Sequence, residues 1–273
     1  MTDLILETQD LTYLEWSKIR HSSGTAGSFL KSTSEISGSK VYYKLSNYDS
    51  ISGVLGHESV NEFIVDRLLN ILGIEHVHYN LIHADIKVNG KFIETYLCSS
   101  DDFKNRGEEK AAFDVYYELE KQDDESPIDF CIRSGFEKYI YEMFLVDFLI
   151  LNRDRHGANI EVLKNPKKKT IRLAPLFDHG LSLLAPCRNE ESIVRFDVMA
   201  DRPIQNFLGS NSSFDNLRLI PENKLPCVTP LNESDRAVLF DGLRSVISEN
   251  LINKIWEMIW RRWQYYEDFC SQK

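Results

Sequence analysis

Hydrophobic and polar residues alternate in short runs over the first hundred positions, as they do in half-buried β-strands. The runs "GSFLKSTS" and "KVYYKLSN" flank the turn residues "ISGSK". A second pair, "VHYNLIHADIKV" and "KFIETYLC", flanks Asn89-Gly90, and Asn-Gly is the strongest short signal for a β-hairpin. We therefore predict an antiparallel sheet in this part of the chain.

A helical period separates the two hairpins. In "HESVNEFIVDRLLNILG" (57–73) the apolar residues recur every three or four positions, and Gly73 is a typical residue for a helix C-terminus. These apolar residues are Val60, Phe63, Ile64, Leu68, Leu69 and Leu72. The pattern predicts one helix that interrupts the sheet.

Beyond residue 99 the helical period dominates. It covers "EKAAFDVYYELEK", "GFEKYIYEMFLVDFLIL" and "ESDRAVLFDGLRSVISENLINKIWEMIWRRWQYYEDF", the last with one break near its middle. One further β-type pair, "NIEVLKN" and "TIRLAPLFD", is joined by the turn-like "NPKKK". The patterns predict an α+β fold with two lobes: residues 1–98 with an antiparallel sheet, and residues 99–273, which are mainly helical.

Composition and charge narrow the choice of partners. The chain has 273 residues, of which 42% are hydrophobic, enough for a sizeable core. Its formal net charge of -10 disfavours binding to phosphate backbones or anionic lipid, since such binders present a basic excess. We therefore expect no direct nucleic-acid partner and no membrane partner.

The cysteines and the first residues bear on the compartment. Five cysteines lie far apart without a CxxC pair, so neither a disulfide framework nor a zinc knuckle is indicated. The segment "MTDLILETQD" has no basic region followed by an apolar core, and no stretch approaches the roughly 20 apolar residues of a membrane helix. A reducing cytoplasm is the expected location.

Residues with catalytic chemistry follow the apolar run "YEMFLVDFLIL" directly. "NRDRHGAN" (152–159) contains Asp154, His156 and Asn159, and the hairpin after it leads into "FDHG", which contains Asp178. A strand out and a strand back return the chain to one edge, so Asp154, Asn159 and Asp178 are expected to lie together. This order is that of kinase catalytic machinery, in which the first Asp is the base and the other two residues hold Mg²⁺ against a nucleotide. His156 is expected to orient the loop through a backbone hydrogen bond, with a second base as the less favoured role.

The sheet half contains candidates for binding phosphate. "HSSGTAGSFLK" places Gly24, Thr25 and Gly27 in a turn of small residues, where backbone N–H groups are able to approach phosphate oxygens. The turn lacks the full GxGxxG pattern. Lys44 lies in the next predicted strand, where kinases have the lysine that holds the α and β phosphates.

The predicted helix and the strand before the second lobe complete this candidate site. Glu58 and Glu62 are one turn apart on the same helix face, so either is placed to pair with the phosphate lysine; we favour Glu62. The strand "ETYLC" is expected to run into a hinge whose backbone, from Tyr96 to Cys98, faces adenine.

These segments resemble the HipA-like serine/threonine kinases, bacterial relatives of the phosphatidylinositol 3/4-kinase fold. The likeness rests on "DFLILNRDRHGANIEVL", "LAPLFDHG", "KVYYKLS" and "VNEFIVDRLLNILGI", within residues 23 to 184. By position, it implies that the catalytic base is Asp154, the metal ligands are Asn159 and Asp178, and the phosphate lysine and its partner are Lys44 and Glu62.

The resemblance also implies an activity and partners. It implies ATP and Mg²⁺ as cofactors and a protein substrate, which for HipA-like toxins includes aminoacyl-tRNA synthetases. In this family a serine of the glycine loop can be autophosphorylated; the candidates here are Ser22, Ser23, Thr25 and Ser28. HipA-like toxins often carry an additional amino-terminal subdomain that meets a DNA-binding antitoxin. Only about twenty residues precede the glycine loop here, so an antitoxin partner is left open.

Each feature also has a simpler explanation. "DRHGAN" is a reasonable polar turn at a helix end, and a strand lysine such as Lys44 is often only a solubilising charge. The ordered set favours the kinase interpretation. His76, His78 and His83 suggest zinc, since the first two share a face of the predicted strand, but no Cys or acidic fourth ligand is near them in sequence. Ordinary strand histidines are therefore favoured.

Two alternatives to a protein kinase are open. A nucleotide-binding pseudokinase or interaction module would lack the base or a metal ligand, and the sequence has both. A lipid or small-molecule kinase is the rival among enzymes, because phosphoinositide kinases share the "DRH...N" loop; the acidic net charge disfavours an anionic membrane substrate.

Overall fold

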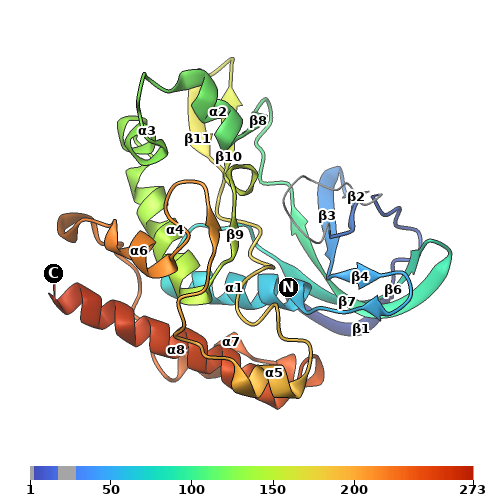
Figure 1. Cartoon of the computed structure of the whole chain (residues 1–273). Helices are drawn as coiled ribbons and strands as arrows, with labels where there is room; N and C mark the ends of the chain where they lie inside the picture. The colour runs from blue at the N-terminus through green and yellow to red at the C-terminus, as the bar shows by residue number, and fades with distance from the viewer. Residues whose placement is uncertain (1–2, 18–28, 273) are drawn as a thin grey trace.

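The computed structural model describes residues 3–17 and 29–272, and in it a β-sheet stands beside a larger, mainly helical part (Figure 1). The sheet has five strands in the order β1-β6-β7-β3-β2. Their bounds are Leu4–Asp10 (β1), Lys31–Ile36 (β2), Ser39–Leu45 (β3), Asn80–Val88 (β6) and Lys91–Asp101 (β7). The predicted α+β class is therefore confirmed.

Both predicted hairpins are present. β2 and β3 are joined by Ser37 and Gly38, with φ of 52° and 81°, and β6 and β7 by Asn89 and Gly90, with φ of 50° and 83°. Two successive residues at positive φ are typical of the turns whose twist matches that of the flanking strands. The turn residues therefore fix the register within each hairpin. The two hairpins pair through β3 and β7, which places Lys44 opposite Cys98.

The sheet differs from the prediction at one edge. β1 pairs in parallel with β6, with Leu4 opposite Leu81, so the sheet is mixed and not wholly antiparallel. The segment "LILETQD" has apolar residues only in its first three positions and no alternation, which is why its sequence does not indicate a strand. β6 also begins at Asn80, so His76 and His78 lie in the connection before the strand and not in it.

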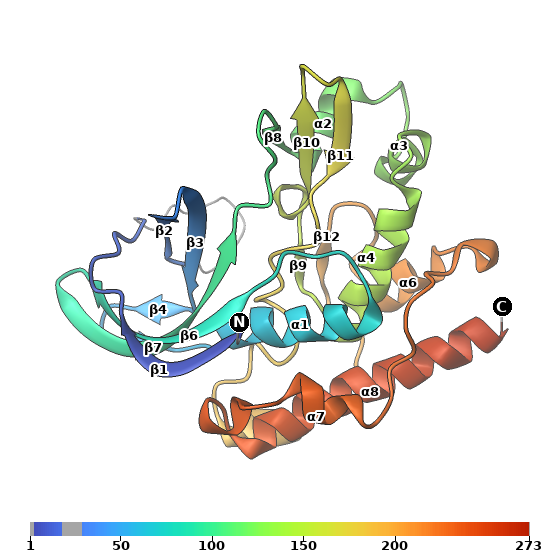
Figure 2. The same cartoon turned by 180° about the vertical axis from the view of Figure 1, so that it is seen from behind.

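Helix α1 (Glu58–Leu72) connects the sheet to the helical part, as Figure 2 shows from behind. Its residues Phe63, Ile64 and Leu68 are fully buried in the same apolar cluster as the residues of α4 (Glu137–Ile150). Gly73 ends the helix in the left-handed conformation, as predicted, and its N–H bonds to the carbonyl of Asn70.

A second sheet of three strands has the order β11-β10-β8. β10 (Glu161–Asn165) and β11 (Thr170–Leu173) form the predicted hairpin. The prediction of helix for "EKAA" was wrong: Glu109–Ala112 is β8, which pairs with β10, and α2 begins only at Phe113 and ends at Glu120. Pairing with β10 overrides the helix propensity of glutamate and alanine here.

The short hairpin of β4 (Tyr48–Asp49) and β5 (Gly53–Val54) lies beside the five-stranded sheet (Figure 1). In the helical part, α3 (Pro127–Arg133), α6 (Ser213–Arg218) and α8 (Glu249–Gln272) contact α4. The other elements are β9 (Asp154–Arg155), α5 (Glu190–Arg195), β12 (Gln205–Asn206) and α7 (Asp235–Leu239). The long carboxy-terminal segment breaks between α7 and α8, where Gly242 has a φ of 74°. Across the described residues, no helix is both long and apolar enough to cross a membrane.

Candidate active site

The loop "NRDRHGAN" leaves α4 through a sharp turn. Leu151 follows the helix with a φ of 49°, a left-handed conformation that stops the helix and turns the chain. Asp154 and Arg155 then form the short strand β9, which pairs in parallel with β12. The loop is therefore held at its start by a helix end and at its centre by strand pairing.

Arg155 anchors the loop from inside. Its Nε and Nη2 donate to the two carboxylate oxygens of Asp147 at 3.0 and 2.8 Å, and both side chains are buried. Its Nη1 donates to the carbonyl of Asn159 at 3.1 Å and to that of Phe177 at 2.9 Å. A single guanidinium thus joins α4, the loop and the segment that contains Asp178.

Asp154 presents a carboxylate oxygen with no partner. Its Oδ1 is buried and accepts no hydrogen bond within residues 3–17 and 29–272, while His156 Nε2 lies 3.8 Å away. Burial raises the pKa of Asp154 above its usual value, although His156 acts to lower it. A buried carboxylate with an unused acceptor is suited to receive a proton from a bound group.

Asn159 and His156 shape the same loop. Asn159 Nδ2 donates to the carbonyl of Asp154 at 2.7 Å, which leaves the Asn159 Oδ1 without a hydrogen bond to any described residue. His156 Nδ1 accepts from the N–H of Ala158 at 3.2 Å, the backbone interaction expected from the sequence. The loop therefore fixes its own curvature while a carboxylate oxygen and an amide oxygen stay available.

Gly157 is required by close packing against α2. A Cβ at this position would lie 2.5 Å from Asp114 Cβ and 2.7 Å from Asp114 Cγ. Such distances are far inside van der Waals contact, so any larger residue would displace the loop or the start of α2.

Lys44, Glu62 and Asp178 form one charged cluster. Lys44 Nζ lies 2.5 Å from Glu62 Oε1 and also donates to Asp178 Oδ1. The Glu62 side chain is fully buried, and Lys31 Nζ lies 3.9 Å from Asp178 Oδ2. Of the two glutamates considered for Lys44, the structure brings Glu62 to it; Glu58 instead accepts from Arg188 at 3.0 Å and from a backbone N–H at 3.1 Å.

Burial and charge determine the ionisation of this cluster. Burial alone would lower the pKa of Lys44, but the carboxylates of Asp178 and Glu62 raise it well above its ordinary value. Burial alone would raise the pKa of Asp178, but Lys44 and Lys31 hold it well below its usual range. Burial raises the pKa of Glu62 against the lowering effect of Lys44. The ammonium of Lys44 thus pairs with two carboxylates, and of these Asp178 is the more readily ionised.

Asp178 and the residue after it turn sharply. Asp178 has a φ of 58°, a conformation that Asp tolerates better than most residues. It lies five positions beyond the end of β11, and not at the strand end as predicted. The N–H of His179 donates to Glu62 Oε2 at 2.7 Å, and burial lowers the pKa of the His179 ring well below its usual value. The neutral, buried His179 therefore fixes the turn that carries Asp178.

A cavity of about 270 Å³ opens beside the charged cluster. Lys44 and Asp178 line it together with apolar and aromatic side chains, among them Phe103 and Phe177, whose ring centroids are 5.7 Å apart. Cys98 also lines it, and burial raises the pKa of its thiol to about 12, so the thiol is neutral. The cavity therefore joins an apolar wall to charged side chains of both signs.

Some predicted residues lie elsewhere. Tyr96 is not among the residues lining the cavity, and its ring stacks on His83 with centroids 4.6 Å apart. The loop candidates Gly24, Thr25 and Gly27, like the phosphorylation candidates Ser22, Ser23 and Ser28, lie outside the described residues.

The sequence interpretation missed several residues that build this site. Arg155 and Asp147 are the main ones, and the available signal was a lone Asp in the otherwise apolar "FLVDFLI", since a buried charge requires a partner. Lys31 and Phe103 carried no signal, because only the fold brings them to the cavity.

Two solved structures of other proteins resemble the fold of this chain. The proinflammatory kinase CtkA of Helicobacter pylori matches with a TM-score of 0.55 and 18% sequence identity, over 93% of this chain and 93% of that one. HipA, from the Shewanella oneidensis complex of HipA, HipB and operator DNA, matches with a TM-score of 0.44 and 15% identity, over 91% of this chain and 59% of that one. No family model and no curated protein matches the sequence. The match to CtkA confirms the predicted fold: the chain has a two-part, kinase-like α+β fold with a sheet on one side and helices on the other.

Proposed function

We propose that this protein is an ATP-dependent serine/threonine kinase, which transfers the γ-phosphate of ATP to a hydroxyl group of a protein substrate. The proposal rests on one observation. Asp178 bonds to Lys44 of the Lys44–Glu62 pair, and the charges of Lys44 and Asp178 act on Asp154. Arg155 joins the carbonyl of Asn159 to that of Phe177, the residue before Asp178. These are the residue types and the order that phosphoryl transfer uses for its base, its metal ligands and its phosphate lysine.

Asp154 is the proposed base. Its raised pKa suits it to orient a substrate hydroxyl and accept its proton, as does its Oδ1, which accepts no hydrogen bond from the described residues. His156 would position the loop and not take part in proton transfer, since its Nδ1 is already used by a backbone N–H.

Asn159 and Asp178 are the proposed ligands of Mg²⁺. An amide oxygen without a partner among the described residues and an ionised carboxylate are hard oxygen donors of the kind Mg²⁺ prefers. Arg155 bonds to the carbonyls of Asn159 and Phe177, so it holds the two ligands to a common frame. When bound, Mg²⁺ would supply charge neutralisation at the phosphates.

The cavity is the proposed nucleotide site. Its apolar wall, including Phe103, Phe177 and Cys98, suits an adenine ring, and Lys44 suits the phosphates. The glycine turn around Gly24 and Gly27 is proposed to cover those phosphates.

Phosphoryl transfer from labelled ATP tests the proposal. Wild-type protein and Asp154→Asn would each be incubated with γ-labelled ATP, Mg²⁺ and one of three acceptors: a panel of aminoacyl-tRNA synthetases, phosphoinositide vesicles, or small alcohols. We expect label on serine or threonine of the protein itself or of a protein acceptor, and none with the variant. Label found only on lipid or alcohol would identify the protein as a lipid or small-molecule kinase. ATP binding without any transfer would make it a pseudokinase.

A further inference from the structure

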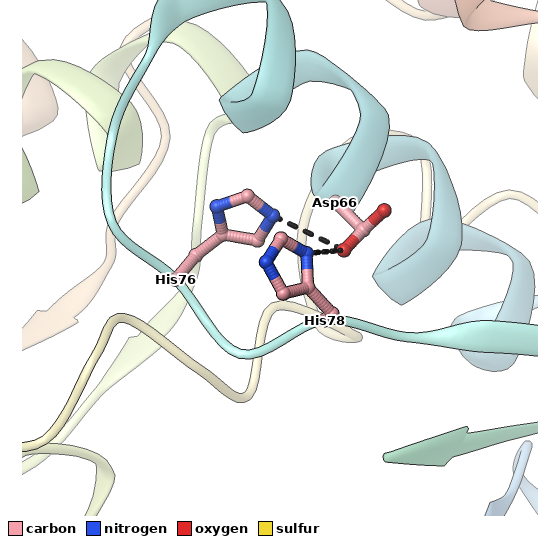
Figure 3. A group of neighbouring side chains, drawn as sticks. All are labelled: Asp66, His76 and His78. Carbon is pink, nitrogen blue, oxygen red and sulfur yellow. Dashed lines mark hydrogen bonds and ion pairs between the residues drawn. The ribbon is translucent and has the colours of Figure 1, made fainter. Parts of the chain in front are cut away.

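A group of metal-binding side chains lies outside the cleft. Asp66 projects from α1, and His76 and His78 point toward it from the connection between α1 and β6 (Figure 3). Their ligand atoms all lie within 4.8 Å of one another. The acidic residue that the sequence did not place near these histidines is therefore supplied by the helix, ten positions before the first of them.

The hydrogen bonds of His76 determine which of its nitrogens is free. His76 Nδ1 lies 2.7 Å from the carbonyl oxygen of Ile74, which only accepts, so Nδ1 carries a proton. The other nitrogen, Nε2, faces Asp66 Oδ1 at 3.1 Å. In neutral His76 these two facing atoms are both electron-rich, so a cation must bridge them: a second proton on the ring, or a metal ion.

The spacing and the surroundings are compatible with a metal ion. His78 Nδ1 lies 3.2 Å from the same Asp66 oxygen, and in a tetrahedral zinc site with bonds of about 2.0 Å the ligand atoms are about 3.3 Å apart. The N–H of Tyr79 donates to this oxygen at 3.1 Å, which holds the carboxylate in place beside the two histidines. A histidine whose other N–H bonds to a carbonyl is the usual arrangement at metal sites. Asn70 Nδ2 donates to the second Asp66 oxygen at 3.1 Å, so that oxygen has a partner as well.

Burial is uneven in a way that allows an ion to enter. The side chains of Asp66 and His76 are 5% and 3% exposed, whereas that of His78 is 74% exposed. The buried pair would give a fixed geometry, and the exposed ring would complete the site from the solvent side, where water would fill the fourth position.

We propose that Asp66, His76 and His78 form a binding site for a divalent transition-metal ion of the Zn²⁺ class, distinct from the proposed Mg²⁺ site. Two nitrogens and one carboxylate oxygen suit Zn²⁺ and not Mg²⁺, which prefers oxygen ligands only. The site lies behind the cleft: Val77 and Tyr79, the residues that follow each histidine, line the cavity. It needs no assumption about kinase activity.

Metal titration of the whole protein tests the site. Chelator-treated, tag-free protein would be titrated with ZnCl₂ by calorimetry in excess Mg²⁺, and Co²⁺ would be used to record ligand-field absorption bands. We expect one Zn²⁺ per chain and the intense visible bands of a four-coordinate Co²⁺ site. His78→Ala, at a position whose side chain is 74% exposed, should weaken Zn²⁺ binding by about 10-fold or more and weaken the Co²⁺ bands.

His83→Ala is the matched control. His83 also faces a carboxylate, with Nε2 3.1 Å from Glu94 Oε1, but among residues 3–17 and 29–272 no group of three metal-ligating side chains includes this pair. This variant should bind Zn²⁺ like the wild type, and Asp66→Asn should bind more weakly. Absence of stoichiometric Zn²⁺ binding, or equal affinity in wild type and His78→Ala, would overturn the proposal and leave Asp66 and His76 as a proton-bridged pair.

Discussion

Replacing Lys44 with methionine tests how the charges of the cleft are balanced. Lys44 Nζ lies 2.5 Å from Glu62 Oε1, and the Glu62 side chain is fully buried. The substitution therefore leaves a buried carboxylate that no cation of the described residues contacts. Removing one partner of a buried ion pair costs about 3–5 kcal/mol, similar to the attraction of about 4 kcal/mol between unit charges 4 Å apart at an effective dielectric constant of 20. We expect Lys44→Met to lower the free energy of unfolding by about 3–5 kcal/mol.

A second substitution separates charge from packing. Glu62→Gln keeps the shape of the side chain and an oxygen for the N–H of His179, but removes the charge. In the Lys44→Met background it should restore about 2 kcal/mol or more of the lost stability. Alone, Glu62→Gln should cost less than Lys44→Met, because Lys44 keeps its bond to Asp178. Urea unfolding of the four proteins at pH 7 measures this cycle.

The pH dependence gives an independent check. Without Lys44, burial raises the pKa of Glu62 still further above its unfolded value of about 4.3, so the folded state binds the proton more tightly. The stability deficit of Lys44→Met should therefore be full above the raised pKa and shrink as the pH falls through it. A double variant no more stable than Lys44→Met, within about 0.5 kcal/mol, together with a deficit that does not change with pH, would show that the Glu62 charge does not cause the loss of stability.

Three further predictions concern the loop. Gly157→Ala should lower the free energy of unfolding by about 1–3 kcal/mol through the clash with Asp114, whereas Ala158→Ser, at an exposed position, should change it by no more than about 0.5 kcal/mol; thermal unfolding compares them. Arg155→Lys should cost about 3 kcal/mol in urea unfolding, because lysine cannot keep the bidentate bond to Asp147 together with the bonds to the carbonyls of Asn159 and Phe177. A cost below about 1 kcal/mol would contradict the anchoring role. Burial raises the pKa of Asp154, so the rate of phosphoryl transfer should rise with pH through that pKa as the base loses its proton. In a pH–rate profile the rise should be centred above the ordinary Asp pKa of about 3.9. A rate that falls with pH in this range would exclude Asp154 as the base.

Local patterns in the sequence predicted much of the fold. Turn residues with positive φ, at Gly38 and Asn89-Gly90, located both hairpins, and the apolar period with Gly73 located α1. What the sequence did not show was pairing between distant segments. β1 has no alternation of its own, and β8 is a strand only because β10 lies beside it. The division after residue 98 stays a prediction, and β7 continues past it to Asp101.

The candidate site likewise contains residues that the sequence predicted and residues that it did not. Asp154, Asn159 and Asp178 were predicted to meet because their order and spacing follow from a loop and a hairpin, both local features. Arg155 was not assigned a role, because its partners Asp147 and Phe177 become its neighbours only in the folded chain. Asp66 was missed beside His76 for the same reason: a helix end and a turn separate them in sequence.

ATP-binding isotherms with and without Mg²⁺, recorded for wild type, Asp154→Asn and Asp178→Ala, separate the roles proposed for the two aspartates. Asp154 is proposed to accept the proton of the substrate hydroxyl, and Asp178 is proposed to hold Mg²⁺ at the bound ATP. We expect wild type and Asp154→Asn to bind ATP more tightly when Mg²⁺ is present, and Asp178→Ala to lose this dependence on Mg²⁺. Unchanged Mg²⁺-dependent binding by Asp178→Ala, or no ATP binding by the wild type, would contradict the account.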